Sequence, residues 1–258
     1  MKSIFSSDLM KMKRSSFWGI VILLPLILLV GNTILLLLNI AEIRNDVIQG
    51  KSYNIWGAMW MVTYYSYFVM IHLSVTILTS FIANIEHQAK SWKLLFSIPL
   101  SRVMFYWTRY FWAVSGVFLS ALFLMLGLWA IGIMFGGGET LNWPRLFHFT
   151  MFPYLSTFAL IGFQLWLSMT IKNQAVSIIT GGLGIVSGLY MLQLTGIPQY
   201  LPWVIPYQIS FSDENIILNI TNIMNTPEFH WEWVGISLIV GLILVFFGSF
   251  HFANQEVN

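Results

Sequence analysis

Residues Trp18–Ile40 have the sequence WGIVILLPLILLVGNTILLLLNI, an apolar run without a charged residue. A helix that crosses the hydrocarbon core of a bilayer needs about 20 such residues. The run follows Lys11, Lys13 and Arg14, as in a signal peptide, but the apolar part of a signal peptide is only about 7–15 residues long. We therefore expect a retained transmembrane helix.

The chain as a whole has the composition of a membrane protein. Of its 258 residues, 57% are hydrophobic and 9% are charged, whereas an average soluble domain carries about 25% charged residues. So few charges would not cover the surface of a soluble domain, but an apolar surface is stable in lipid. The chain has no cysteine, which excludes disulfides, thiolate metal sites and cysteine nucleophiles.

Six apolar stretches are long enough to span a bilayer, and only helices satisfy every backbone polar group within such a stretch. We predict an all-α polytopic membrane protein with one transmembrane domain over residues 1–258. The predicted spans are 18–40, 55–83, 106–135, 146–171, 176–194 and 234–252.

Basic residues fall mostly on one side of these six spans. Cytoplasmic loops collect Lys and Arg, so both chain ends and the loop between the second and third spans are predicted to be cytoplasmic. The outer side would hold only Arg44, Lys51 and Arg145. The cytoplasmic side would hold Lys2, Lys11, Lys13, Arg14, Lys90, Lys93, Arg102, Arg109 and Lys172.

Two segments outside the spans have a character of their own. Residues 1–16 carry apolar side chains at near-helical spacing ahead of basic residues, which predicts an amphipathic helix on the inner membrane surface. Residues 195–233 combine Pro198, Pro202 and Pro206 with aromatic side chains. This outer segment is too apolar for a solvated loop and too interrupted for a span, so we expect a re-entrant or interfacial structure.

The sequence contains no energy source for transport. It lacks a phosphate-binding loop of the G-x-x-x-x-G-K-S/T type, and no Asp or Glu falls inside a predicted span, where ion-coupled transporters usually carry acids. If the chain transports, its energy must come from another chain. We expect no metal site and no cofactor bound by this chain, and no nucleic-acid partner.

The second predicted span is rich in hydroxyl groups and contains His72, the one ionisable residue deep in a span. Two interpretations remain open. In the first, the polar side chains only form hydrogen bonds with neighbouring helices, as is common in membranes; in the second, they line a substrate path. The residues expected along such a path are Tyr64, Tyr67, His72 and Thr76.

A membrane-protease site is not supported. Ser187 lies in the sequence GIVSG over 184–188, but Ile185 occupies the position where a rhomboid-type nucleophile motif has Gly. The small residues of the fifth span instead predict close packing against another helix. They are Ser177, Gly181, Gly184 and Gly188.

The strongest signal is the cytoplasmic loop at 84–102, whose residues 85–102 are IEHQAKSWKLLFSIPLSR. As a helix, this segment places a charged face beside an apolar face that contains Trp92, and Pro99 ends it. Such a helix between two spans either docks into a protein partner or lies against lipid.

At this loop the sequence resembles the permease subunits of type-2 ABC exporters. The similarity is carried by Glu86, Trp92-Lys93, Leu94-Leu95 and the segment Pro99-Leu100-Ser101-Arg102. Within that family the chain is most similar to the small permeases of lantibiotic immunity and bacitracin-resistance transporters.

The resemblance implies that the loop forms a coupling helix seated on a cytoplasmic ATPase. Two ATPase subunits would bind ATP and Mg²⁺, and a second permease, identical or related, would complete a pathway that expels an amphipathic antimicrobial peptide from the membrane. The chain itself would not be an enzyme. The expected docking residues are Glu86, His87, Lys90, Trp92, Lys93, Leu95, Pro99 and Arg102.

Three alternatives stay open. The chain could export another hydrophobic cargo, or serve as a structural or sensory membrane subunit that moves no cargo, because a docking helix suits a sensor as well as a pump. A membrane-embedded enzyme is disfavoured, since no convergent set of acids, nucleophiles or metal ligands is evident.

Overall fold

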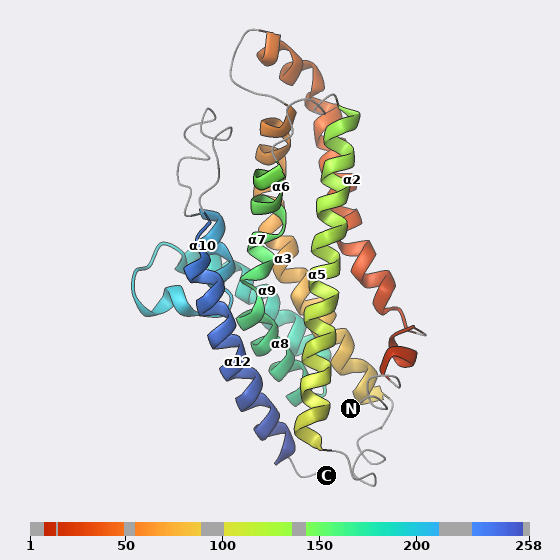
Figure 1. The fold of residues 1–258 in the computed structure, drawn as a ribbon, viewed down its shortest axis with the longest axis vertical. Coiled ribbons are helices and arrows are strands. Elements are labelled where there is room, and N and C mark those ends of the chain that lie inside the picture. Colours follow the sequence, from red (N-terminus) through yellow and green to blue (C-terminus); the bar gives the residue numbers. More distant parts are fainter. Residues whose placement is uncertain are drawn as a thin grey trace.

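The computed structural model describes residues 8–13, 15–48, 55–88, 101–135, 143–211 and 229–254. Within those ranges all regular secondary structure is helical, so the all-α prediction is confirmed. The helices form an elongated bundle (Figure 1). Segment 8–13, the end of α3, the start of α5 and the end of α12 lie at one end of it, which is the predicted cytoplasmic end (Figure 1).

Three helices are longer than a bilayer requires. They are α2 (Phe17–Ile48), α3 (Ile55–Gln88) and α5 (Arg102–Met134). At a rise of about 1.5 Å per residue each is about 50 Å long, against a hydrocarbon core of about 30 Å. Helix α3 packs against α2, α5, α8 and α9, so it forms the centre of the bundle.

The predicted loop at 84–102 is shorter in the structure. Helix α3 continues through Gln88 and α5 begins at Arg102, so Glu86 and His87 belong to the last turn of the second span rather than to a separate loop helix. Hydropathy falls after Ala83, which is why the sequence prediction ended the span there. The helix continues because the charge on Glu86 is matched inside the bundle by Arg109, at 3.2 Å.

The fourth predicted span is not a single helix. Residues 143–170 form three helical pieces, α6 (Trp143–Thr150), α7 (Phe152–Leu155) and α8 (Phe158–Thr170). Pro153 has no N–H to donate to the preceding turn. At the second interruption, the hydroxyls of Ser156 and Thr157 donate to backbone carbonyls three residues earlier, each at 2.7 Å, and so compete with the regular helix.

Helix α12 (Trp231–Ala253) covers this interruption. The Ser237 hydroxyl donates to the carbonyl of Ser156 at 2.5 Å and accepts from the backbone N–H of Ala159 at 3.1 Å. A Cβ added at Gly241 would lie 2.7 Å from the carbonyl carbon of Phe158. The last span therefore contacts the backbone of α8 directly and satisfies polar groups that lipid could not.

Helix α9 (Gln174–Met191) presents its small residues to the inside of the bundle. A Cβ added at Gly181 would overlap Oγ1 of Thr76 on α3. One added at Gly188 would lie 2.7 Å from Cε2 of Tyr207, in the outer segment. Gly184 faces the Trp203 side chain and Ser177 is fully buried. The stripe Ser177–Gly181–Gly184–Gly188 is thus the contact face of α9, as close packing of membrane helices requires.

The outer segment that follows α9 contains the short 3-10 helix η2 (Ile197–Tyr200) and α10 (Ile205–Phe211). Residues 204–209 are turned into the bundle, since Val204, Ile205, Tyr207 and Ile209 are fully buried, whereas Ile197 and Tyr200 of η2 are exposed. The part of the predicted outer segment at 212–228 lies outside the described residues.

Five helices in the described ranges are long and apolar enough to cross a membrane, namely α2, α3, α5, α9 and α12. The remaining predicted span, the fourth, is the interrupted run α6–α7–α8, of which α8 has 13 residues. The chain is a polytopic membrane protein by this measure, and a count of six remains a prediction.

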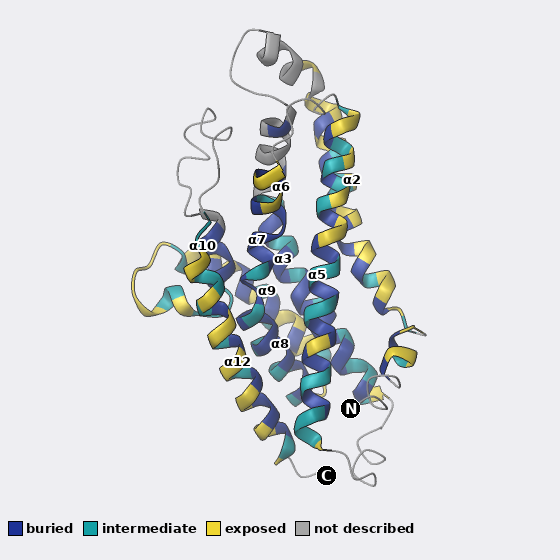
Figure 2. Cartoon of the chain, viewed as in Figure 1, coloured by how far each residue is buried: buried dark blue, intermediate teal, exposed yellow. Residues whose placement is uncertain are grey.

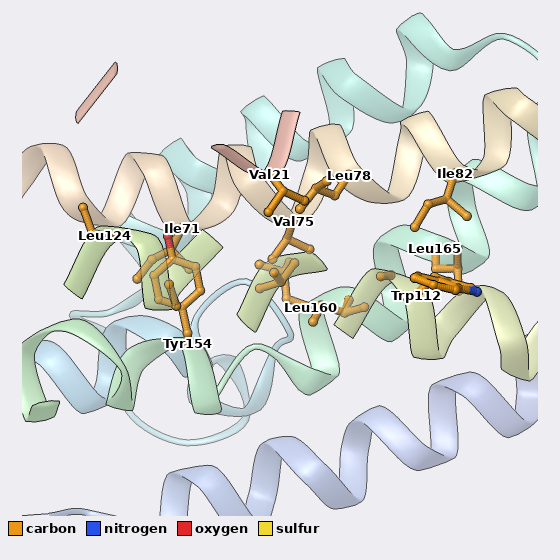
Figure 3. Packing of buried hydrophobic residues seen from close by; sticks show 14 of the residues in the cluster. Val21, Ile71, Val75, Leu78, Ile82, Trp112, Leu124, Tyr154, Leu160 and Leu165 are labelled. Atoms are coloured by element: carbon orange, nitrogen blue, oxygen red, sulfur yellow. The ribbon is translucent and has the colours of Figure 1, made fainter. Parts of the chain in front are cut away.

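The distribution of buried and exposed side chains is that expected in lipid, because large apolar side chains are exposed on the outside of the bundle as well as buried in its core. The core joins Val75 and Leu78 of α3 with Leu160 of α8, Trp112 of α5 and Val21 of α2 (Figure 3). Exposed side chains follow the outward faces of α2 and α12 (Figure 2). On α12 they are large and apolar: Leu238, Ile239, Leu242, Ile243, Phe246, Phe247 and Phe250.

Candidate functional site

A buried cluster of charges joins three parts of the chain at the predicted cytoplasmic end. Nη2 of Arg109 on α5 lies 2.7 Å from Oδ1 of Asp8 in segment 8–13, and 3.2 Å from Oε1 of Glu86 on α3. Nζ of Lys11 lies 3.4 Å from Oε1 of Glu86. The side chains of Arg109, Glu86 and Asp8 are 1%, 0% and 3% exposed, and that of Lys11 is 36% exposed. We call these four residues the ion cluster.

The ion cluster is balanced, with two acids and two bases. Each carboxylate has a basic partner, and the Arg109 guanidinium also lies over the ring of Phe105, 4.4 Å from its centroid. Charges in such a dry environment are stable only when they are paired, and removing one partner of a buried pair typically costs about 3–5 kcal/mol. The ion cluster therefore holds segment 8–13, α3 and α5 in one arrangement.

Three of the predicted docking residues flank the loop and are tied to the bundle. Glu86 belongs to the ion cluster. His87 contacts the carbonyl of Ser168, at the end of α8, through Nε2 at 3.1 Å. Arg102 donates from Nη1 to the carbonyl of Ala253, at the end of α12, at 2.9 Å. Lys90, Trp92, Lys93, Leu95 and Pro99 lie outside the described residues.

The predicted substrate-path residues are buried among protein groups. The Tyr67 hydroxyl donates to the carbonyl of Thr150. His72 contacts two backbone carbonyls and stacks on Tyr207, and Thr76 packs on Gly181. The side chain of Tyr64 is outside the described part of the chain. A path along this helix would require these contacts to open.

A cluster of hydroxyl groups links α3, α8 and α9. Ser177 Oγ lies 2.5 Å from Ser168 Oγ and 3.1 Å from Ser80 Oγ. The amide of Gln164 donates to the carbonyl of Ser177 at 2.6 Å. Hydrogen bonds between membrane helices contribute about 0.6 kcal/mol each, so this cluster adds modestly to the packing of the glycine stripe.

Sequence reasoning missed the ion cluster as a unit. Arg109 was placed near the start of the third span, but not inside the bundle, and Asp8 was given no role. One signal was available: Asp8 is the only acid in a strongly basic N-terminal region, and Glu86 is the only acid near the loop. Gln164 and Ser168 were also missed, although their i,i+4 spacing puts both on one face of a helix.

Among the described residues, no group of three His, Asp or Glu side chains could hold a metal ion. The site is a set of ion pairs and polar contacts around the two ends of one loop.

Comparison with known proteins bears on this arrangement. No curated protein and no solved structure matches the chain. The family model described as "ABC-2 family transporter protein" matches residues 4–188, which include segment 8–13, α2, α3, the loop, α5 and most of α9. Because that match covers well over half of the 258 residues, this chain belongs to the ABC-2 family of transporter proteins.

Proposed function

We propose that this chain is the permease subunit of an ATP-driven exporter and that it receives its motion through the loop between α3 and α5. The observation that carries the proposal is that both ends of this loop are tied to the bundle. The ion cluster and His87 hold its entry, and Arg102 holds its exit.

These ties define how a displacement of the loop would spread. At the entry, Glu86 would move Arg109 on α5 and, with Lys11, segment 8–13. At the exit, Arg102 would move the end of α12. Because buried ion pairs and close helix contacts resist local deformation, the helices would rock together, as alternating access requires.

The proposed docking residues fall into two groups. Lys90, Trp92, Lys93 and Leu95 would enter the ATPase, with the Trp92 side chain as the buried anchor, since aromatic residues dominate interface energies. Glu86, His87 and Arg102 would instead hold the loop in place from the permease side. Pro99 would end the docking helix.

We further propose the assembly and the cargo. Two ATPase subunits, which bind ATP and Mg²⁺, would serve this chain and a second permease that is identical or related. The cargo would be an amphipathic antimicrobial peptide taken from a bacterial cytoplasmic membrane, with both chain ends in the cytoplasm. The wide apolar faces of α2 and α12 suit contact with lipid and with such a cargo.

The test is reconstitution of the chain with its ATPase in liposomes that contain a fluorescent lantibiotic-type peptide. We expect peptide to stimulate ATP hydrolysis and ATP to drive peptide out of the membrane. Trp92→Ala should abolish both, by at least tenfold, because the buried anchor is lost. Trp18→Ala removes an exposed tryptophan of α2 and is the matched control.

A competing function, that of a sensory subunit, predicts a different outcome. The chain would still bind the ATPase through Trp92, and peptide would still change ATP hydrolysis, but no peptide would leave the membrane. Stimulated hydrolysis without export would therefore contradict the exporter proposal. Export of an unrelated hydrophobic compound, with no effect of the peptide, would keep the permease and reject the cargo.

A further inference from the structure

Both ring nitrogens of His72 on α3 lie against hydrogen-bond acceptors. Nδ1 lies 3.0 Å from the carbonyl oxygen of Phe68, and Nε2 lies 2.9 Å from the carbonyl oxygen of Trp203. Both distances are those of hydrogen bonds. A carbonyl oxygen can only accept, so each of the two ring nitrogens faces a group that requires a donor.

A neutral imidazole has a single N–H. In either tautomer one nitrogen would donate and the other would place its lone pair against a carbonyl oxygen at 3.0 Å or less. An imidazolium donates from both nitrogens and satisfies both carbonyls. We propose that His72 is doubly protonated when the outer segment is docked, so that one proton controls whether Trp203–Tyr207 stays against the second span.

One neighbour of the ring favours a cation, although no described residue supplies a counter-ion. The Tyr207 ring stacks on the imidazole with centroids 4.5 Å apart and planes 17° apart, and an aromatic face attracts a cation. His72 forms no ion pair with any described residue, and Tyr207 is the one described titratable side chain in ring contact with it. On α3, Tyr67 directs its hydroxyl to Thr150 instead.

The same geometry shows which of the two hydrogen bonds, to Phe68 or to Trp203, would break when His72 loses a proton. Phe68 is on the same helix, one turn before His72, so its carbonyl cannot move away. Trp203 belongs to the outer segment, and it reaches α3 only because Gly188 leaves room. A Cβ added at Gly188 would lie 2.9 Å from the Trp203 carbonyl oxygen. Loss of the second proton would therefore release Trp203 rather than Phe68.

Burial sets the direction of the pH dependence. An uncompensated charge at membrane depth is costly, so the doubly protonated ring persists only while both carbonyls accept from it. Acidic conditions should hold the outer segment in place, and alkaline conditions should loosen it. This behaviour is independent of the cargo and of the ATPase.

The first test is solid-state NMR of the full chain in lipid bilayers with ¹⁵N-labelled histidine. The His72 signals are assigned by comparison with His72→Gln, or, should that variant not accumulate, by replacing the other four histidines in turn. We expect N–H signals from both ring nitrogens at about pH 5. One protonated and one unprotonated nitrogen at that pH would overturn the proposal.

The second test measures the outer segment itself. The chain has no cysteine, so spin labels at Ile197→Cys and Met134→Cys, both more than 80% exposed, report one distance. We expect a narrow distribution at about pH 5 and a broad one at about pH 8. His72→Phe should be broad at both pH values, because it keeps a ring but has no donor, and His72→Gln should not respond to pH.

His230→Gln is the matched control, because His230 is partly exposed and pairs with Glu232 at the start of α12 rather than with residues 203–207. It should keep the full pH response. A wild-type distance that is the same at both pH values, or a response that His230→Gln removes, would show that His72 does not control the segment.

Discussion

Replacing Arg109 by Met tests the central feature of the site. The change removes one base from the ion cluster, so the buried carboxylates of Asp8 and Glu86 both lose their contact with the guanidinium. Within the ion cluster Lys11 contacts Glu86, so Asp8 loses the one basic partner that the described residues give it. We expect a loss of about 3–5 kcal/mol in the free energy of unfolding, the usual effect of leaving a buried charge unpaired.

The reasoning also predicts a rescue. In the Arg109→Met background, Asp8→Asn and Glu86→Gln remove the two carboxylate charges that Arg109 contacts in the starting protein. Neutral replacement of a whole buried ion cluster is often tolerated, so stability should return to within about 1 kcal/mol of the starting protein. Lys11 is partly exposed, so its charge can still reach water.

The assay is denaturation in mixed micelles by increasing the fraction of SDS, followed by tryptophan fluorescence. Lys172→Met removes an exposed base in the turn before α9 and should change stability by no more than about 0.5 kcal/mol. If Arg109→Met is no more harmful than Lys172→Met, or if the triple variant is less stable than Arg109→Met alone, the ion cluster does not hold the three segments together.

Two further predictions concern helix packing. Gly181→Ala should destabilise the protein by about 1–3 kcal/mol because its Cβ would overlap Thr76. Adding Thr76→Ala in the same chain should restore most of the lost stability, measured by the same SDS titration. If Thr76→Ala restores nothing, the overlap is not the cause of the loss. Ser237→Ala should lower the free energy of unfolding by about 1–3 kcal/mol, because it leaves the Ser156 carbonyl without the Ser237 hydroxyl. The Ser249 hydroxyl donates within its own helix, so Ser249→Ala should be nearly neutral. Equal effects of the two changes would contradict the role given to Ser237.

Much of the fold could be predicted because lipid imposes a simple rule. A long apolar run must be a helix, so Trp18–Ile40 alone places α2, and the same rule finds α3, α5, α9 and α12. Hydropathy does not report backbone geometry, however. The run that contains the interruptions between α6, α7 and α8 is long and apolar like an unbroken span, and only Pro153 and the hydroxyl residues Ser156 and Thr157 indicate where it breaks.

The candidate site was less predictable for a different reason. Asp8, Glu86 and Arg109 are far apart in the chain, and nothing local in the sequence shows that their charges meet. Taken singly, each is a polar residue near the membrane surface, so the sequence predicts a docking role for Glu86 and only a cytoplasmic position for Arg109. Spacing rules detect partners on one helix, such as the stripe from Ser177 to Gly188, but not partners on different helices.

The interruption at Ser156 has a consequence for how the molecule can bend. In hydrocarbon, an interrupted helix normally leaves backbone polar groups without a hydrogen-bond partner, and this opposes bending. Here the hydroxyl of Ser237 pairs with both the carbonyl of Ser156 and the N–H of Ala159, and it would move with them. The fourth predicted span can therefore bend at this interruption while it stays in contact with α12. Such bending requires α12 to move as well. The far end of α12 is held by the hydrogen bond from Arg102 to Ala253, next to the α3–α5 loop on which the ATPase is proposed to act.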